Sequence, residues 1–242
     1  ASYGSTLFNN TRGLKFIETG TTKFGQIVFG QVNNTTELSK KIYALEEQIH
    51  KVADKVYPSI KKRGGGYQKI EIDEFPKEHM LSLKVHVDTC DAMGANIINT
   101  ILEGIASYLE TELDNKEILM SILSNYNTTS VVRIEGKINI KDLEKNGMSG
   151  EEVAYRMERA SVLAHIDPYR AVTHNKGVMN GISSVVLVTG NDTRSVEASA
   201  HAYASKDGQY RGLTTWKFDK ENKQLIGSIE LPLAIGRIGG GI

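Results

Sequence analysis

The order of apolar periodicities between residues 20 and 124 constrains the fold of this 242-residue chain more than any other feature. Residues 34–57 carry apolar side chains at alternating spacings of four and three, which predicts one amphipathic helix. Asn34 followed by Glu37 resembles a capping box at its start, and Pro58 marks its end.

Period-two patterns surround this helix. The segment KFGQIVFGQV precedes it as an expected strand, and QKIEIDEF and LSLKVHVD follow it with alternating polar and apolar residues. In the last of these, one face carries Leu81, Leu83, Val85 and Val87.

A second helix is expected from near Asp91, because apolar residues recur every four positions, at Ile97, Ile101, Ile105 and Leu109. EILMSILSN then reads as a further strand. The resulting order of strand, helix, two strands, helix and strand is typical of an antiparallel α+β fold of the split βαβ kind. A doubly wound parallel sheet does not fit this order.

The remaining residues, 125–242, are less regular. VVRIEGKINI predicts a strand and SGEEVAYRMERAS a helix. Residues 178–204 fit helical spacing, although their many β-branched residues favour a strand. We expect a helix, because the run continues into RSVEASAHAYAS, which is rich in helix formers.

Composition narrows the class of protein. Lys+Arg and Asp+Glu are both 29, so no basic excess supports a nucleic-acid or membrane-surface partner. No apolar run reaches the roughly 18 residues of a membrane span. The single cysteine, Cys90, has no partner for an internal disulfide, which favours a reducing compartment and hence a cytoplasmic protein.

The first motif with chemical content is DAMGAN, residues 91–96. A glycine in the first turn of a helix lets a phosphate or ribose approach the backbone, whose free N–H groups favour an anion. The alternative is that Asp91 merely caps the helix and Gly94 permits close packing. No GxGxxG follows a strand, so the Rossmann fingerprint is absent.

The second motif is DPYRAVTHNKGVMNG, followed by VTGND. Arg170 can bind a carboxylate with two hydrogen bonds, and the Lys176 ammonium can stabilise a developing oxyanion. Asn180 faces the same way as Lys176 if the segment is helical. Asp192 comes sixteen residues after Lys176, about 160° around a straight helix, so Gly190 must break the helix or the two residues must meet across a subunit boundary. The alternative is a surface lysine and an ordinary helix cap.

Other residues that often carry chemistry have structural interpretations here. The six histidines show no metal-ligand spacing, so we expect surface or packed histidines and no metal. Cys90 has no CxxC partner, and a structural role is expected. Residues 64–66, three glycines, predict a hairpin turn in preference to a phosphate loop.

Four motifs together, DAMGANIINT, HNKGVMNGI, TGND and EASAHAYASKDGQYRGLTTW, resemble the 3-hydroxy-3-methylglutaryl-CoA (HMG-CoA) reductase family, in its class II branch. The resemblance covers essentially the whole chain. It implies the interconversion of HMG-CoA with mevalonate plus coenzyme A, a step of isoprenoid biosynthesis with two nicotinamide hydride transfers. It also implies a homodimer with its active site at the subunit interface.

The resemblance assigns roles to individual residues. Lys176 matches the catalytic lysine and Asp192 the catalytic aspartate that hydrogen-bonds it, while Arg170 and Asn180 match residues that hold the glutaryl portion. The implied cofactor-binding residues are Asp91, Met93, Gly94, Ala95, Asn96 and Thr100. A small ferredoxin-like NAD(P)-binding domain, residues 20–124, is expected within a larger substrate domain of mixed helices and strands, residues 1–19 and 125–242, with a central helix.

Two further family residues, a catalytic glutamate and a catalytic histidine, are expected outside this chain, before ASYG and after Ile242. The chain as it stands is therefore expected to bind cofactor with little turnover. The alternatives are a degenerate, binding-only core that holds NAD(P) and a CoA thioester, and a general CoA-thioester binding module. The cofactor is NADPH or NADH, and basic residues near Asp54 favour NADPH, namely Lys55, Lys61, Lys62 and Arg63.

Overall fold

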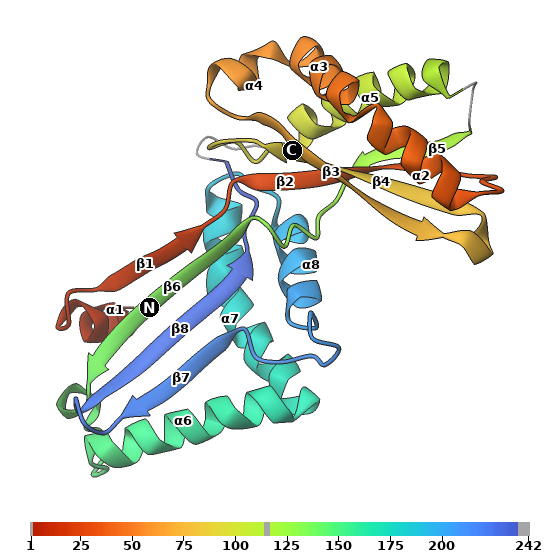
Figure 1. The fold of residues 1–242 in the computed structure, drawn as a ribbon. Coiled ribbons are helices and arrows are strands. Elements are labelled where there is room, and N and C mark those ends of the chain that lie inside the picture. Colours follow the sequence, from red (N-terminus) through yellow and green to blue (C-terminus); the bar gives the residue numbers. More distant parts are fainter. Residues whose placement is uncertain (1, 114–116, 237–242) are drawn as a thin grey trace. The chain divides into compact units, whose positions relative to one another are not determined.

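The computed structural model describes residues 2–113 and 117–236. Its contacts group the chain into two compact units, each with a four-stranded antiparallel sheet (Figure 1). Unit 1 holds the described residues of Ala1–Gly20, Val131–Val188 and Thr193–Leu233, and unit 2 those of Thr21–Ser130, Thr189–Asp192 and Ala234–Ile242. The predicted mixed α+β class is confirmed.

Unit 2 has the element order that the periodicities predicted. Its sheet has the strand order β3-β4-β2-β5, with every neighbouring pair antiparallel. Along the chain its elements are β2 (Thr22–Phe29), α2 (Thr35–Ala44), α3 (Glu46–Val56), α4 (Pro58–Lys62), β3 (Gly66–Phe75), the 3-10 helix η1 (Pro76–Glu78), β4 (Met80–Asp88), α5 (Ala95–Glu112) and β5 (Ile118–Leu123).

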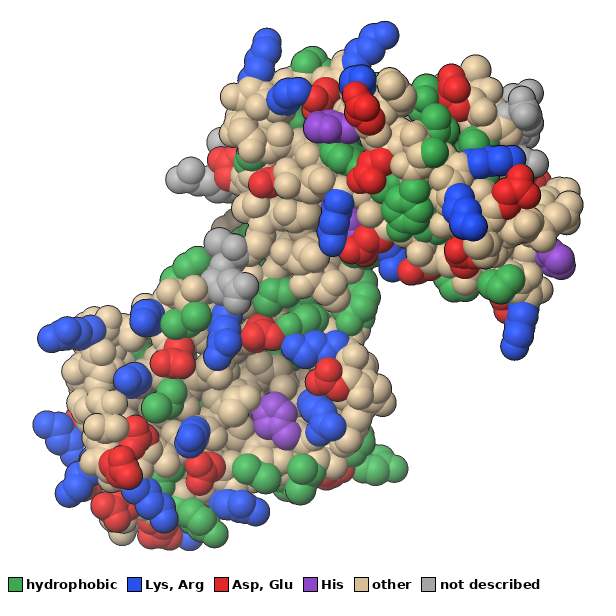
Figure 2. Space-filling view, in the orientation of Figure 1, with side chains coloured by type: hydrophobic (Ala, Val, Ile, Leu, Met, Phe, Trp, Pro, Cys, Tyr) green, Lys and Arg blue, Asp and Glu red, His purple; other side chains and the backbone are tan. Residues whose placement is uncertain are grey.

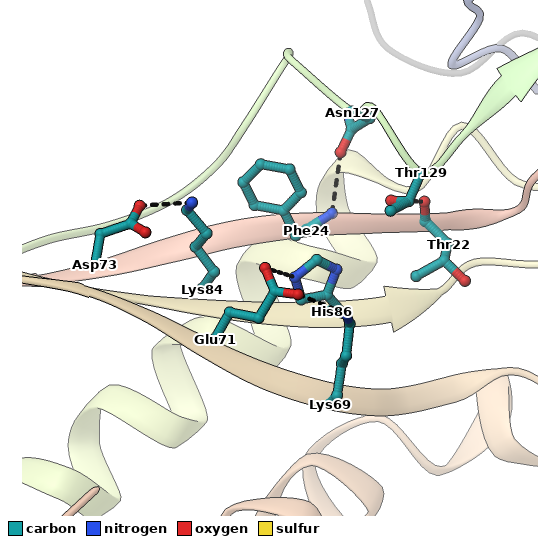
Figure 3. A network of polar contacts seen from close by, with 9 residues as sticks. All are labelled: Thr22, Phe24, Lys69, Glu71, Asp73, Lys84, His86, Asn127 and Thr129. Atoms are coloured by element: carbon teal, nitrogen blue, oxygen red, sulfur yellow. Dashed lines mark hydrogen bonds and ion pairs between the residues drawn. The ribbon is translucent and has the colours of Figure 1, made fainter. Parts of the chain in front are cut away.

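Helices cover one face of this sheet (Figure 1). The inward residues of β4 are fully buried, as their alternation predicted; they are Leu81, Leu83, Val85 and Val87. On the opposite face, the Nε2 atom of His86 lies 3.3 Å from the Glu71 carboxylate, and Lys84 pairs with Asp73 (Figure 3). Period two therefore separates an apolar core from a charged outer face.

The helix predicted over residues 34–57 is divided at Leu45 into α2 and α3. Its start is confirmed, since the Asn34 side chain accepts a hydrogen bond from the Glu37 N–H. The prediction of one helix was wrong because the two halves pack on different partners: α2 lies against β3 and β4, whereas α3 lies against α5 and β3.

The glycine run at residues 64–66 connects α4 to β3, so it is not the hairpin turn that was predicted. Gly64 and Gly66 have φ values of 89° and 108°. A Cβ atom on Gly65 would lie 2.5 Å from the Asp88 carbonyl oxygen and 2.7 Å from the Cys90 sulfur. Glycine is therefore needed here for positive φ and for close packing against the end of β4.

Unit 1 has the strand order β1-β6-β8-β7, again fully antiparallel. Its elements are α1 (Ser2–Asn9), β1 (Leu14–Thr19), β6 (Val131–Asn139), the 3-10 helix η2 (Ile140–Leu143), α6 (Gly150–Ile166), α7 (Pro168–Val188), α8 (Thr193–Tyr203), β7 (Thr214–Asp219) and β8 (Gln224–Pro232).

Two apolar clusters hold unit 1 together. One joins α1 and α6 to the sheet around Leu7, Ile138 and Leu225, and the other joins α7 and α8 to β8 around Met179 and Leu231. The exposed face of this unit, turned to the viewer in Figure 2, carries cationic and anionic side chains interspersed.

The ambiguous run at residues 178–204 is helical, as expected, and is divided into α7 and α8. Gly190 has φ 69° and lies in the connection, so the helix is broken here, as the first of the two alternatives for Lys176 and Asp192 requires. Among the described residues, no helix combines the length and the hydropathy that a membrane crossing requires.

Candidate functional site

The DAMGAN motif forms a turn that leads from β4 into α5. The helix begins at Ala95, later than the start expected near Asp91, because Gly94 has φ 95° and takes the N-cap position. Asp91 is therefore not the N-cap residue. Gly94 offers no side-chain acceptor, so the first N–H groups of α5 receive no bond from their cap residue. Such N–H groups are suited to an anionic ligand.

Close packing fixes the shape of this turn. A Cβ atom on Gly94 would lie 2.5 Å from Cγ2 of Thr89, which is fully buried. Met93 is buried, whereas Asn96 and Thr100 are exposed and lie four residues apart on α5, on one face. The predicted residues at positions 91–96 thus form one continuous turn, with Thr100 on the next turn of the helix.

Helix α7 carries the lysine motif. Its buried face is formed by residues at spacings close to one turn, namely Ala171, Asn175, Met179 and Val186. Lys176 and Asn180 both lie on the exposed side, as the predicted helical spacing requires. The Asn175 amide is fully buried; it donates to the Arg211 carbonyl at 2.8 Å and accepts from the Leu213 N–H at 2.8 Å. This clamp sets the rotation of α7 and thereby the direction of Lys176.

Arg170 does not share the face of Lys176. Six residues separate them, so they lie about 120° apart around the helix and about 9 Å apart along it. Arg170 is half-buried and close enough to His174 to contribute, after burial, to lowering the pKa of that imidazole. The structure therefore brings Lys176 and Asn180 together on α7 and leaves Arg170 on another side of the same helix.

Two glycines beside the lysine have no neighbours that explain them. Gly177 and Gly181 lie in the interior of α7, are exposed, and have no heavy atom within 4 Å of the position of a Cβ. A glycine inside a helix costs about 1 kcal/mol relative to alanine. No close packing contact within the described residues offsets this cost in stability.

Asp192 lies in the connection between α7 and α8, half-buried, and groups with unit 2, whereas Lys176 lies in unit 1. The neighbouring Asn191 is 4% exposed. Its amide accepts a hydrogen bond from the Gly236 N–H at 2.8 Å and donates to the Gly236 carbonyl at 3.2 Å. A Cβ on Gly236 would lie 3.2 Å from the backbone nitrogen of Met93. Asn191 therefore ties the aspartate loop to a segment that contacts the DAMGAN turn.

The other candidate groups are structural. Burial raises the pKa of the Cys90 thiol, with Asp88 and Asp91 adding to the shift, so it is not poised as a thiolate nucleophile. Among the six histidines, His174 bonds the Thr214 hydroxyl at 2.6 Å, and His165 and His201 bond Thr215 and Tyr210. Across residues 2–113 and 117–236, no group of three His, Cys, Asp or Glu side chains could hold a metal ion.

Comparison with known proteins decides the family. The sequence model described as "Hydroxymethylglutaryl-coenzyme A reductase" matches residues 1–242, the full length of the chain. The chain belongs to the hydroxymethylglutaryl-coenzyme A reductase family. A 3-hydroxy-3-methylglutaryl-coenzyme A reductase of Archaeoglobus fulgidus is 35% identical over 243 residues, which cover 99% of this chain and 54% of that protein. A probable reductase of Borreliella burgdorferi is 35% identical over 209 residues, covering 86% of this chain and 48% of that protein.

Solved structures of this reductase family agree with the fold. A 3-hydroxy-3-methylglutaryl-coenzyme A reductase from Streptococcus pneumoniae matches with a TM-score of 0.92 and 40% identity, over 98% of this chain and 56% of that one. A class II reductase from the same organism, bound to NADPH in open conformations, matches with a TM-score of 0.92 over 99% of this chain and 65% of that one. The resemblance to the class II branch is thus confirmed, and the chain spans about half the length of the curated relatives it matches.

Several buried polar residues around these motifs were not predicted, among them Lys23, Thr89, Asn175 and Asn191. The burial of Lys23 could have been predicted, because every second residue of β2 points inward and Lys23 falls on the same face as the buried Ile27 and Phe29. Thr89 and Asn191 carry no comparable signal, since both lie in connections without periodicity.

Proposed function

We propose that this chain supplies the cofactor turn and the lysine helix of an HMG-CoA reductase, which interconverts HMG-CoA and mevalonate plus coenzyme A. The observation that carries the proposal is the pair of unexplained glycines, Gly177 and Gly181, beside Lys176 and Asn180 on the exposed side of α7. An acyl group can approach the helix closely where the backbone carries no side chain, and here the Lys176 ammonium and the Asn180 amide lie next to such positions.

The residues of α7 and the aspartate that follows it have distinct proposed roles. The Lys176 ammonium stabilises the negative charge that develops on the thioester carbonyl oxygen, and loss of one such donor typically costs about 3–4 kcal/mol of activation free energy. Asp192 hydrogen-bonds the lysine and tunes its acidity. Asn180 and Arg170 hold the glutaryl portion, and the Arg170 guanidinium binds the carboxylate of that portion.

The DAMGAN turn fits a nicotinamide dinucleotide. The α5 N-terminus has no side-chain cap, and Gly94 keeps the backbone bare at that point. The proposed binding residues are Asp91, Met93, Gly94, Ala95, Asn96 and Thr100. When bound, the dinucleotide supplies the reducing equivalents for the thioester; the chain orients it through backbone N–H groups. No metal is proposed.

NADPH is the proposed preference. The Arg63 carbonyl lies 3.7 Å from the Cys90 sulfur, so the end of α4 adjoins the residue that precedes the motif. Lys61 is paired with Asp54. Lys62 and Arg63 are exposed and are the proposed partners of a ribose 2′-phosphate.

The proposed assembly is a homodimer that covers α7. Large apolar side chains are exposed along this helix, among them Tyr169, Val172, Val185, Leu187 and Val188, of which Tyr169 is 87% and Val188 81% exposed. A second copy that buries them would also place the lysine in the drier setting in which its charge acts most strongly.

Titration calorimetry of the 242-residue chain with HMG-CoA, and separately with NADPH, tests the proposal. Lys176→Ala and Asn180→Ala should weaken HMG-CoA binding and leave NADPH binding unchanged, and Arg159→Ala on α6 serves as a matched surface control. Turnover followed at the reduced-nicotinamide absorbance band distinguishes a catalytic chain from the binding-only alternative. Binding of HMG-CoA that is equally tight in Lys176→Ala and in the wild type would contradict the assignment of the lysine.

A further inference from the structure

A buried lysine lies beneath the cofactor turn. Lys23 is 4% exposed and shares the inward face of β2 with Ile27 and Phe29. Burial lowers the pKa of its ammonium, while the Asp88 carboxylate acts in the opposite direction. An apolar residue at this strand position would avoid the cost of removing a charge from water, so the ammonium needs a reason to be there.

The ammonium donates two hydrogen bonds into the segment that leads into DAMGAN. The Nζ atom donates to the Thr89 hydroxyl oxygen at 2.6 Å and to the Ala92 carbonyl at 3.3 Å. Thr89 Oγ1 is also 3.1 Å from the Ala92 carbonyl, and the Ala92 N–H donates to the Thr89 carbonyl at 3.1 Å. One cation therefore fixes both ends of a tight turn.

The same threonine touches the N-cap of α5. The position of a Cβ on Gly94 lies 3.1 Å from Thr89 Oγ1 and 2.5 Å from its Cγ2. Displacement of Thr89 would therefore displace Gly94 and the uncapped N–H groups that follow it. A cation and a helix N-terminus are both positive, so their proximity is unfavourable in the protein alone and favourable once an anion binds.

We infer that Lys23 is a positioning residue for the dinucleotide: its ammonium holds Thr89 and Ala92 so that Gly94 and the α5 N-terminus are preformed to receive the pyrophosphate. This inference rests on the proposed function, because it names the support of the proposed cofactor site. Lys23 itself is not proposed to touch the reacting atoms.

The test compares Lys23→Met with the wild-type chain by calorimetric titration of NADPH and by thermal unfolding. Methionine keeps the volume and removes the charge. Dinucleotide affinity should fall about ten-fold, because hydrogen bonds to a charged group are lost at the site, while the melting temperature stays level or rises. Lys84→Met, on the charged outer face of the same sheet, is the matched control and should keep wild-type affinity.

The possible outcomes either support the role of Lys23 or contradict it. A folded Lys23→Met variant with wild-type NADPH affinity would overturn the inference, as would a loss of affinity that only parallels a loss of folded protein. If Lys23→Met does not fold, Thr89→Val takes its place: it keeps the methyl contact with Gly94 and removes the acceptor, and unchanged affinity there overturns the inference equally. Failure of the wild-type chain to bind NADPH would instead overturn the proposed function, and this inference with it.

Discussion

Replacing Gly181 by alanine should stabilise the chain and at the same time impair its proposed site. Nothing lies within 4 Å of the position of the new Cβ, and the residue is in the interior of α7. The helix should therefore gain the full difference in propensity, about 0.8–1.0 kcal/mol. For a chain of this size, that corresponds to a rise of about 2–4 °C in melting temperature.

The same substitution should weaken the binding of HMG-CoA, although it stabilises the chain. A methyl group on the exposed side of α7, four residues beyond Gly177, blocks the close approach that we propose for the acyl group. HMG-CoA affinity should fall at least about ten-fold, equivalent to about 1.4 kcal/mol. Thermal unfolding by circular dichroism and titration calorimetry with HMG-CoA measure the two effects on the same preparation.

Two glycines provide matched controls. Gly4 lies in α1 and also has open space around its Cβ position, so Gly4→Ala should stabilise the chain and leave HMG-CoA binding intact. Gly208 has open space but φ 82°, so Gly208→Ala should destabilise by about 1 kcal/mol. A melting temperature of Gly181→Ala below that of the wild type in dilute solution would refute the structural reasoning. Higher stability with unchanged HMG-CoA affinity would refute the functional reasoning.

Three other substitutions test contacts within unit 2. Asn191→Ala should lower the free energy of unfolding by about 1–3 kcal/mol in urea, because the backbone groups that its buried amide binds lose their partners; an unchanged midpoint would contradict the proposed clamp. Gly94→Ala should destabilise by about 2 kcal/mol or more and weaken NADPH binding, since alanine would adopt positive φ and collide with Thr89; unfolding and titration together check this. Burial lowers the pKa of His86, although the Glu71 carboxylate acts in the opposite direction. At pH values just below the ordinary histidine pKa of about 6.5, the unfolded chain therefore binds more protons than the folded chain. Stability should therefore fall as the pH falls through that window, and His86→Gln should flatten this dependence in denaturant unfolding at several pH values; an unaltered slope would exclude His86 as its source.

Much of unit 2 could be predicted because its patterns are local. Alternation in β4 separates an apolar row that includes Leu83 from a polar row that includes Lys84, and no tertiary information is needed to see it. The break at Leu45 could not be predicted in this way, because the apolar stripe runs on through it. The two halves share β3 but differ in their other partner, which is β4 for α2 and α5 for α3, and the sequence alone does not show this difference.

The start of α5 shows a different limit. Apolar spacing places the helix correctly from Ile97 onward, but its first residue depends on the left-handed backbone of Gly94. The buried Thr89 also leaves no room for a side chain at this position. That contact joins residues whose types alone do not signal it. The same holds for Lys23, whose charge is explained only by partners more than sixty residues away in the sequence.

The two residues assigned to the chemistry are preceded by the same kind of anchor. Lys176 follows Asn175, and Asp192 follows Asn191; both asparagines are buried, and each uses its amide as donor and acceptor to backbone groups of a distant segment. An asparagine anchored in this way fixes the backbone at its own position and thereby helps to set the direction of the next side chain. This gives a structural reason for the amide that precedes the lysine in HNKG and the aspartate in TGND: in each motif the buried asparagine holds the main chain next to the charged residue that we propose for the chemistry.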